Sequence, residues 1–321
     1  MNKNQILEIL KNLLRIRMTE LKISEEYSKQ KMRCPVHLSI GQEAIAAPLK
    51  VLLTKKDIVV SGHRAHAHYI GKGCNLEKFI FELYLKEKGF SRGKAGSMHL
   101  FDKKNGFYGS SPIVANSIPL GVGMGYYNKI NKIDNVVLIF FGDGATEEGV
   151  FYESLNFAAI HNLRVLFICE NNFYSVYSNL KFRQPHNRKI SEISKSLGIY
   201  SIKENGNDIR ITTKTLSKAL NFIKKNSKPI LIEYSTFRFV EHCGPNKDDH
   251  LKYRNQSELN YWMKNDPIKI MYKFINNKDK SLLHKFKRNF NNELNSIFLK
   301  AEKLKYPKES VAYTNLYNEK S

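Results

Sequence analysis

Two short polar turns, each directly after an apolar run, contain the residues whose chemistry stands out in this chain. Residues 136–141 (VVLIFF) precede the turn GDG, which contains Asp143, and residues 164–169 (RVLFIC) precede ENN, which ends in Asn172. A carboxylate and an amide oxygen are ligands that suit Mg²⁺. Glycines beside Asp143 allow backbone conformations that other residues resist. The two turns therefore predict a site for a divalent cation that carries a diphosphate.

The segments around these turns explain how the two side chains could meet. Continuous apolar runs are typical of strands that are buried on both faces. Between the runs, apolar residues recur at helical spacing: Phe151, Leu155, Ala158 and Ala159. A strand, a helix and a second strand predict parallel neighbours, and open parallel sheets bind ligands at their carboxyl edge. We therefore expect Asp143 and Asn172 at the same edge.

The rest of the chain predicts an α/β fold, with a parallel sheet and helices on both faces. Further strands are expected at 57–61, 199–202 and 229–237, with a helix at 213–224. Residues 4–30 predict an amphipathic helix through Ile6, Leu10, Leu13 and Leu14, and residues 279–304 predict a second one. We interpret residues 1–321 as a single domain, with a helical N-terminal arm over 1–45 and a helical C-terminal extension over 255–321.

Composition restricts the partners and the compartment. The formal net charge is +22, but the lysines are scattered and form no basic helix, so we expect no nucleic-acid partner and favour an acidic partner subunit. The four cysteines are far apart and lack a CxxC pattern, which argues against disulfides and points to a reducing compartment. No apolar segment suits a membrane span or a signal peptide, so a cytoplasmic protein without membrane contact is expected.

A cationic segment follows the strand expected at 57–61. Residues 62–69 (GHRAHAHY) contain three histidines and Arg64. If this segment is extended, His66 and His68 lie on the same side as Arg64. So many cationic groups suggest an anionic ligand, and a guanidinium can hold phosphate oxygens with two donors. Zinc is the alternative, although no cysteine or acidic ligand completes a recognisable zinc site.

Several motifs between residues 37 and 254 together resemble one family. GDG followed by NN is similar to the thiamine diphosphate motif, and HLSIGQEA (37–44), SRGKAGSMH (91–99) and FRFVEHC (237–243) are similar to HLxxGQEA, GKGGSMH and YRxxGHS. These are motifs of the α subunit of the first component of 2-oxo acid dehydrogenases, the pyruvate, acetoin and branched-chain group. The resemblance implies a thiamine diphosphate-binding fold, with thiamine diphosphate and Mg²⁺ as cofactors.

The resemblance also assigns roles to single residues. It implies that Asp143, Asn172 and the backbone carbonyl of Tyr174 bind the metal. It implies that His63, standing where the family has an aromatic residue, and Arg64 hold the diphosphate. The other implied cofactor-binding residues are Pro112, Val114 (which would support the bent cofactor), Gly144, Ala145 and His242. His242 would lie near the reactive thiazolium and His37 near the substrate, so that both are candidate catalytic residues.

Two departures from the family lie directly after His242. Cys243 stands where regulated mitochondrial members have a serine that is phosphorylated, so that control is expected to be absent. Residues 244–249 (GPNKDD) form a longer loop than usual, which leaves the acceptor and the substrate open.

The resemblance implies an enzyme with a partner. In the family, the glutamate that activates the cofactor belongs to the β subunit, so we expect an α₂β₂ heterotetramer and no activity of this chain alone. The implied reaction is oxidative decarboxylation of a small 2-oxo acid (pyruvate- or acetoin-like), with acyl transfer to a lipoyl-bearing component. The alternative is a thiamine-dependent carboligase, or a decarboxylase without a lipoyl acceptor, acting on a sugar-linked or other carbonyl substrate.

A nucleotide-binding protein of another kind is disfavoured. The chain has no Walker motif, and the glycines at 121, 123 and 125 follow Pro119 and not a strand. We therefore interpret these glycines as sites of close helix packing.

Overall fold

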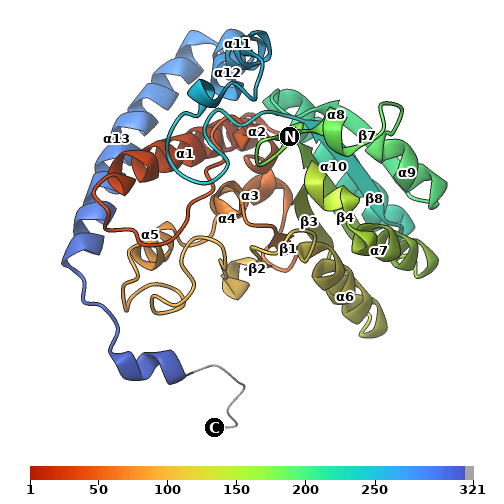
Figure 1. Cartoon of the computed structure of the whole chain (residues 1–321), viewed down its shortest axis with the longest axis horizontal. Coiled ribbons are helices and arrows are strands. Elements are labelled where there is room, and N and C mark those ends of the chain that lie inside the picture. The colour runs from red at the N-terminus through yellow and green to blue at the C-terminus, as the bar shows by residue number, and fades with distance from the viewer. Residues whose placement is uncertain (315–321) are drawn as a thin grey trace.

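The computed structural model describes residues 1–314, and its centre is a sheet of six parallel strands in the order β2-β1-β3-β4-β8-β7 (Figure 1). The parallel sheet predicted from the apolar runs is confirmed, whereas the edge strand β2 was not predicted. The strands are β1 (Ile58–Ser61), β2 (Phe107–Ser110), β3 (Val137–Gly142), β4 (Val165–Asn171), β7 (Tyr200–Asn205) and β8 (Ile230–Ser235).

Strand β3 shows why a continuous apolar run was required. Leu138 and Phe140 belong to the buried cluster on one face of the sheet, and Val137, Ile139 and Phe141 belong to the cluster on the other face. Because both faces exclude water, neither alternate set of side chains could be polar. The same holds for residues 165–169 of β4, its neighbour in parallel register.

Helices cover both faces, as predicted. One buried cluster contains residues of α1 (Lys3–Tyr27), α4 (His66–Lys72), α10 (Ile209–Asn226) and α13 (Asn277–Lys303). The other contains residues of α6 (Ser117–Ile130), α7 (Gly149–Ile160) and α9 (Ile190–Ser196). The shorter helices are α2 (Glu43–Ala46), α3 (Leu49–Leu52), α5 (Leu76–Leu83), α8 (Leu180–Arg183), α11 (Gln256–Lys264) and α12 (Pro267–Phe274).

The glycines of α6 agree with the packing interpretation. A Cβ atom on Gly121 would lie 2.4 Å from Cγ1 of Ile139 in β3, and one on Gly125 would lie 2.6 Å from Cγ2 of Val165 in β4. The helix can approach the sheet only because these two positions have no side chain. Gly123, by contrast, has nothing within 4 Å of its Cβ position.

Helices α1 and α13 lie side by side at one end of the sheet (Figure 1). Their buried residues share one cluster with the strands. Leu10, Leu13 and Leu14 are buried as expected, whereas Ile6 is 45% exposed and does not belong to the packed face. Residues 315–321 of the expected C-terminal extension lie outside the described part of the chain.

Two local predictions were wrong. Residues 62–69 are not extended, because α4 begins at His66. In this helix His66 lies 3.0 Å from Glu20 and His68 lies 3.1 Å from Glu170. These carboxylates come from α1 and β4, so nothing in the local sequence indicates them. In α7, Ala159 is only partly buried, unlike Phe151, Leu155 and Ala158.

Within the described residues, no helix has both the length and the apolar character that a membrane crossing requires. All four cysteines lie in the described part and are free thiols.

Candidate active site

A pocket of about 960 Å³, part of it open to solvent, lies where β1, β3 and β4 end. It is the carboxyl edge at which Asp143 and Asn172 were expected to meet. All the site residues predicted from the sequence line this pocket: His37, His63, Arg64, Pro112, Val114, Asp143, Gly144, Ala145, Asn172, Tyr174 and His242. The structure thus brings together residues from six separate segments of the chain.

One wall of the pocket provides oxygen ligands. Asp143 follows β3 and Asn172 follows β4, and both are buried. The Oδ1 atom of Asp143 is buried without a hydrogen-bond partner. The Oδ1 atom of Asn172 accepts a hydrogen bond from the backbone N–H of Tyr174 (3.1 Å). Burial raises the pKa of Asp143 above its ordinary value, although Arg183 and backbone N–H groups oppose this effect.

A short hairpin, β5 (Tyr174–Ser175) and β6 (Ser178–Asn179), continues this wall. A Cβ atom on Gly144 would lie 3.1 Å from Oγ of Ser175, so glycine lets the hairpin approach the turn after β3. The side chain of Tyr174 points toward α11, where its hydroxyl donates to Glu258 (2.6 Å). The backbone of Tyr174, and not its phenol, is therefore what this residue can offer a ligand.

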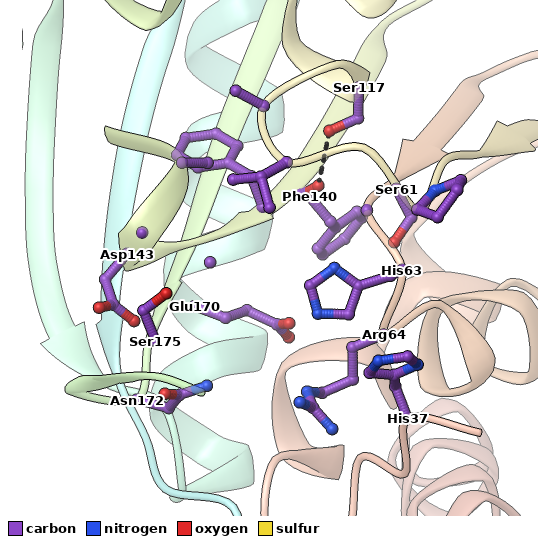
Figure 2. A pocket seen from close by; sticks show the side chains of 18 of the residues that line it. His37, Ser61, His63, Arg64, Ser117, Phe140, Asp143, Glu170, Asn172 and Ser175 are labelled. Carbon is purple, nitrogen blue, oxygen red and sulfur yellow. Dashed lines mark hydrogen bonds between the residues drawn. The ribbon is translucent and has the colours of Figure 1, made fainter. Parts of the chain in front are cut away.

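The opposite wall contains Arg64 and a histidine cluster (Figure 2). Arg64 is buried and donates to the backbone oxygens of Leu38 (2.6 Å) and His242 (3.1 Å). Burial lowers the pKa of Arg64 to about 10, so it remains a cation at neutral pH. The rings of the histidine cluster (His37, His63 and His242) have centroids 4.6 to 5.3 Å apart.

The histidines of this cluster are neutral. Burial, together with the nearby Arg64, lowers the pKa to about 2 for His37, about 4 for His63 and about 3 for His242. One nitrogen from each ring lies within 4.8 Å of the others, a spacing that three metal ligands could have. Because Arg64 lies beside them, a cation here would meet a buried positive charge, whereas an anion would be attracted. The anion interpretation of this segment is favoured over zinc.

A loop at the mouth forms the third side. Pro112 and Val114 line the pocket, and Val114 is half-exposed. The next residue, Ala115, has φ 65°, in the left-handed region that residues with a Cβ seldom adopt. Such backbone strain is often held in place at functional sites.

Other pocket residues were not anticipated. Oγ of Ser61 lies 2.8 Å from Nδ1 of His68, whose Nε2 lies 3.1 Å from Oε1 of Glu170. Figure 2 shows Glu170 reaching between the two walls. Arg183, at the end of α8, donates to the carboxylates of both Asp143 and Glu147. Basic residues are common throughout this chain, so the sequence did not indicate that Arg183 would contact these carboxylates.

This arrangement suits a ligand with two kinds of charge. Buried oxygen atoms at Asp143 and Asn172 fit a divalent cation. Arg64 and imidazole N–H groups, facing them across the pocket, fit phosphate oxygens. A molecule with a diphosphate and its cation satisfies both walls at once.

Comparison with known proteins shows which family this chain is similar to. A family model described as Dehydrogenase E1 component matches residues 11–309. The chain is 32% identical to the pyruvate dehydrogenase E1 component subunit alpha of Rickettsia bellii, over 98% of this chain and 96% of that protein. It is 32% identical to the mitochondrial protein of that name in Dictyostelium discoideum, over 98% and 83%. It is 34% identical to the Rhizobium meliloti protein, over 83% and 76%.

The family model covers every segment that lines the pocket, together with most of α1 and all of α13. The resemblance inferred from the GDG, NN and histidine motifs is confirmed. The chain belongs to the dehydrogenase E1 component family.

Proposed function

We propose that this chain is the α subunit of a thiamine diphosphate-dependent 2-oxo acid dehydrogenase that acts on a pyruvate-like substrate. The observation that carries the proposal is the pair of facing walls in one pocket. Asp143 and Asn172 lie on one side, and Arg64 and the histidine cluster lie on the other. The relatives, which are named as pyruvate dehydrogenase α subunits and match over most of the chain, support the same reaction class.

Mg²⁺ would bind Oδ1 of Asp143, the side-chain oxygen of Asn172 and the backbone carbonyl of Tyr174. The unpartnered Oδ1 supports this assignment, because a buried acceptor without a partner is costly unless a ligand reaches it. The diphosphate would be held by Arg64 and His63.

The remaining pocket residues would shape the space for the cofactor rings. Gly144 and Ala145 bring the turn after β3 close to the diphosphate, with no side chain beyond a methyl group. Pro112 and Val114 present an apolar surface at the mouth, which suits an aromatic ring. Both expectations rest on the positions of these residues in the pocket wall.

When bound, thiamine diphosphate supplies the nucleophilic carbon and the electron-accepting ring that decarboxylation of a 2-oxo acid requires. The contribution of His242 and His37 is to orient the carboxylate of the substrate and to move protons. In the free chain both are neutral. A bound anion raises the pKa of a nearby histidine, so that each imidazole takes up a proton more readily once the pocket is filled and can then pass that proton on.

We propose that a β subunit completes the site, in an α₂β₂ heterotetramer. Among the described residues that line the pocket, the carboxylates are Asp143 and Glu170. Oδ1 of Asp143 is assigned to the cation and its Oδ2 accepts from Arg183, while Glu170 is bound to His68, so neither carboxylate is left to activate the cofactor. Large apolar side chains that line the pocket are exposed, which supports a partner surface there: Ile113, Val114 and Val176.

The acceptor is proposed to be a lipoyl group on a further component. Residues 244–249 follow His242, which lines the pocket, so this loop would meet the arriving acceptor. Its Asp248 is buried and paired with Arg254, so the loop has a defined shape.

The proposal is tested by co-expression with a candidate β subunit. Purified α and α–β proteins are compared for decarboxylation of straight, branched and diketone substrates, and for carboligation with aldehyde acceptors. Activity that requires both subunits and is highest with pyruvate is the expected result. Turnover by the α chain alone, or activity only as a carboligase, would contradict it.

Cofactor binding is tested separately with Asp143→Ala. This variant should lose Mg²⁺-dependent thiamine diphosphate binding, measured by calorimetry. The control is Asp134→Asn, which alters a carboxylate whose side chain is 89% exposed and remote from the pocket. Unchanged affinity in Asp143→Ala would refute the assignment of the cation site.

A further inference from the structure

One side chain from the segment after the Tyr174 hairpin contacts the wall of the pocket that contains Asp143 and Asn172. After β6 the chain forms α8, which ends at Arg183. The guanidinium of Arg183 reaches back to the turn after β3, where Nη2 donates to Asp143 and Nη1 donates to Glu147. Its Nε donates to the backbone oxygen of Ser178 (3.2 Å). Each nitrogen of the group therefore has an acceptor, and the side chain is only 10% exposed.

Arg183 uses one oxygen of Asp143 and leaves the other unused. It binds Oδ2, while Oδ1 is buried and has no partner. An aspartate that binds a metal through one oxygen needs its other oxygen held, so that the ligating atom points at the ion. Oδ2 is held in this way here.

The charges around Arg183 also fit a cation nearby. A lone guanidinium next to a metal site would repel the ion. Glu147 neutralises this guanidinium, because it accepts from Nη1. Asp143, Arg183 and Glu147 together have a net charge of one negative unit. These three side chains as a set therefore still attract Mg²⁺ to Asp143.

Other side chains already fasten this segment to the turn. Nε2 of Gln184 donates to Glu147 (2.9 Å), and Nη2 of Arg188 donates to the backbone oxygen of Thr146 and to the hydroxyl of Tyr152. Docking of the segment therefore does not require the bond between Arg183 and Asp143. That bond affects the carboxylate itself.

We propose that Arg183 is a positioning residue for the divalent cation: it holds Oδ2 of Asp143 so that Oδ1 faces the ion, and it links Asp143 to the hairpin that carries the Tyr174 carbonyl. The inference rests on the proposed function, because it needs a cation at Asp143. It adds a residue that touches neither the cation nor the diphosphate.

A competing explanation predicts the opposite effect. If Arg183 only occupies the place of the cation, Mg²⁺ must displace it, and removal of the guanidinium would strengthen metal binding. If Arg183 aligns Asp143, removal would weaken metal binding. The sign of the change distinguishes the two.

The probe is Mn²⁺, titrated into the α–β protein in the presence of thiamine diphosphate, with free Mn²⁺ measured by electron paramagnetic resonance. Arg183→Met keeps most of the apolar stem of the side chain and removes its donors. We expect its Mn²⁺ affinity to fall by about 10- to 100-fold, the usual effect of losing a residue that orients a metal ligand. Arg183→Lys, which restores one charged donor, should recover most of the affinity.

Arg188→Met is the matched control. It removes a fastening of the same segment to the same turn without touching Asp143, and its Mn²⁺ affinity should stay within about twofold of the wild type. Equal or tighter Mn²⁺ binding by Arg183→Met, or an equal loss in Arg188→Met, would overturn the inference. If Arg183→Met does not fold, Arg183→Gln is measured against the same control and decides in the same way.

The wild type separates this inference from the proposal on which it rests. Absence of Mn²⁺ binding by the wild-type α–β protein with thiamine diphosphate would refute the proposed function together with the inference. Tight wild-type binding that is insensitive to Arg183→Met would overturn the inference alone.

Discussion

Asp248→Asn should release the loop that carries His242 without disturbing the sheet. Asp248 is 2% exposed and accepts hydrogen bonds from Arg254 and from the hydroxyl of Tyr253. It also lies 3.5 Å from Arg238. Both arginines are buried, at 1% for Arg238 and 7% for Arg254. A single buried carboxylate therefore faces both of the positive charges beneath this loop.

The structure sets the size of the effect. Removing one partner of a buried ion pair costs about 3–5 kcal/mol, because the other charge is left without compensation. Asp249 lies 3.2 Å from Arg254 and offsets part of this cost, so the lower figure is expected. A loss of about 3 kcal/mol raises the population of the open loop by roughly 100-fold. Asp249→Asn is the control, because that side chain is 36% exposed and partly exposed pairs contribute about 1 kcal/mol or less.

Hydrogen exchange of loop amides measures this opening. The N–H of Gly244 donates to Val36 (2.8 Å), and the N–H of Glu241 donates to Asn246 (2.9 Å), so both amides report on the closed loop. Their exchange should be roughly 100-fold faster in Asp248→Asn, and changed less than about fivefold in Asp249→Asn. Amides in β3 should be unaffected. Equal protection of Gly244 in Asp248→Asn and the wild type would refute the role given to this carboxylate.

Three further predictions concern stability of the α chain. Gly121→Ala should lower the free energy of unfolding, measured in urea, by about 1–3 kcal/mol, because its Cβ would overlap Ile139. Gly123→Ala in the same helix has open space and should raise it by up to about 1 kcal/mol. Equal effects of the two substitutions would contradict the packing model. Burial and Arg64 lower the pKa of His63 from its ordinary 6.5 to about 4. Between pH 4 and 6.5, His63 therefore binds a proton in the unfolded chain but not in the folded chain. Stability should thus fall as the pH drops from 6.5 toward 4, by roughly 1 kcal/mol per pH unit for each clustered histidine, and His63→Phe should reduce the slope measured by thermal unfolding. Val176 has φ 53° and is 41% exposed, so Val176→Gly should stabilise the chain by about 1 kcal/mol in urea; a loss would show that its side-chain contacts outweigh the strain.

The central part of the fold could be predicted because its signals are local. Residues 136–141 and 165–169 are apolar without interruption, a pattern typical of a strand buried on both faces. The turns after these strands had to reach the same edge once the strands were parallel neighbours. The meeting of Asp143 and Asn172 therefore followed from the order of elements.

The opposite wall could not be predicted in this way. His37, His63 and His242 come from three loops that are far apart in the sequence, and only the resemblance to a family placed them together. The helix that begins at His66 places this side chain against Glu20 of α1, a contact made across the core. Arg183 gave no signal, because a basic residue in a lysine-rich chain is ordinary until the fold brings it to a buried carboxylate.

Without a ligand, several polar groups of the pocket are buried in unfavourable surroundings, and a ligand that bonds to them lowers the free energy. Buried polar atoms without partners line it, at Nδ1 of His37, Oδ1 of Asp143 and the side-chain amide of Gln42. Each such atom costs about 1–3 kcal/mol until a partner reaches it. A cation alone satisfies Asp143 but faces the charge of Arg64, and a diphosphate alone satisfies Arg64 but faces the carboxylates of Asp143 and Glu170. Each ligand removes the repulsion that the other would meet, so on the proposed function Mg²⁺ and thiamine diphosphate bind cooperatively, and the coupling arises from the facing charges of the two walls.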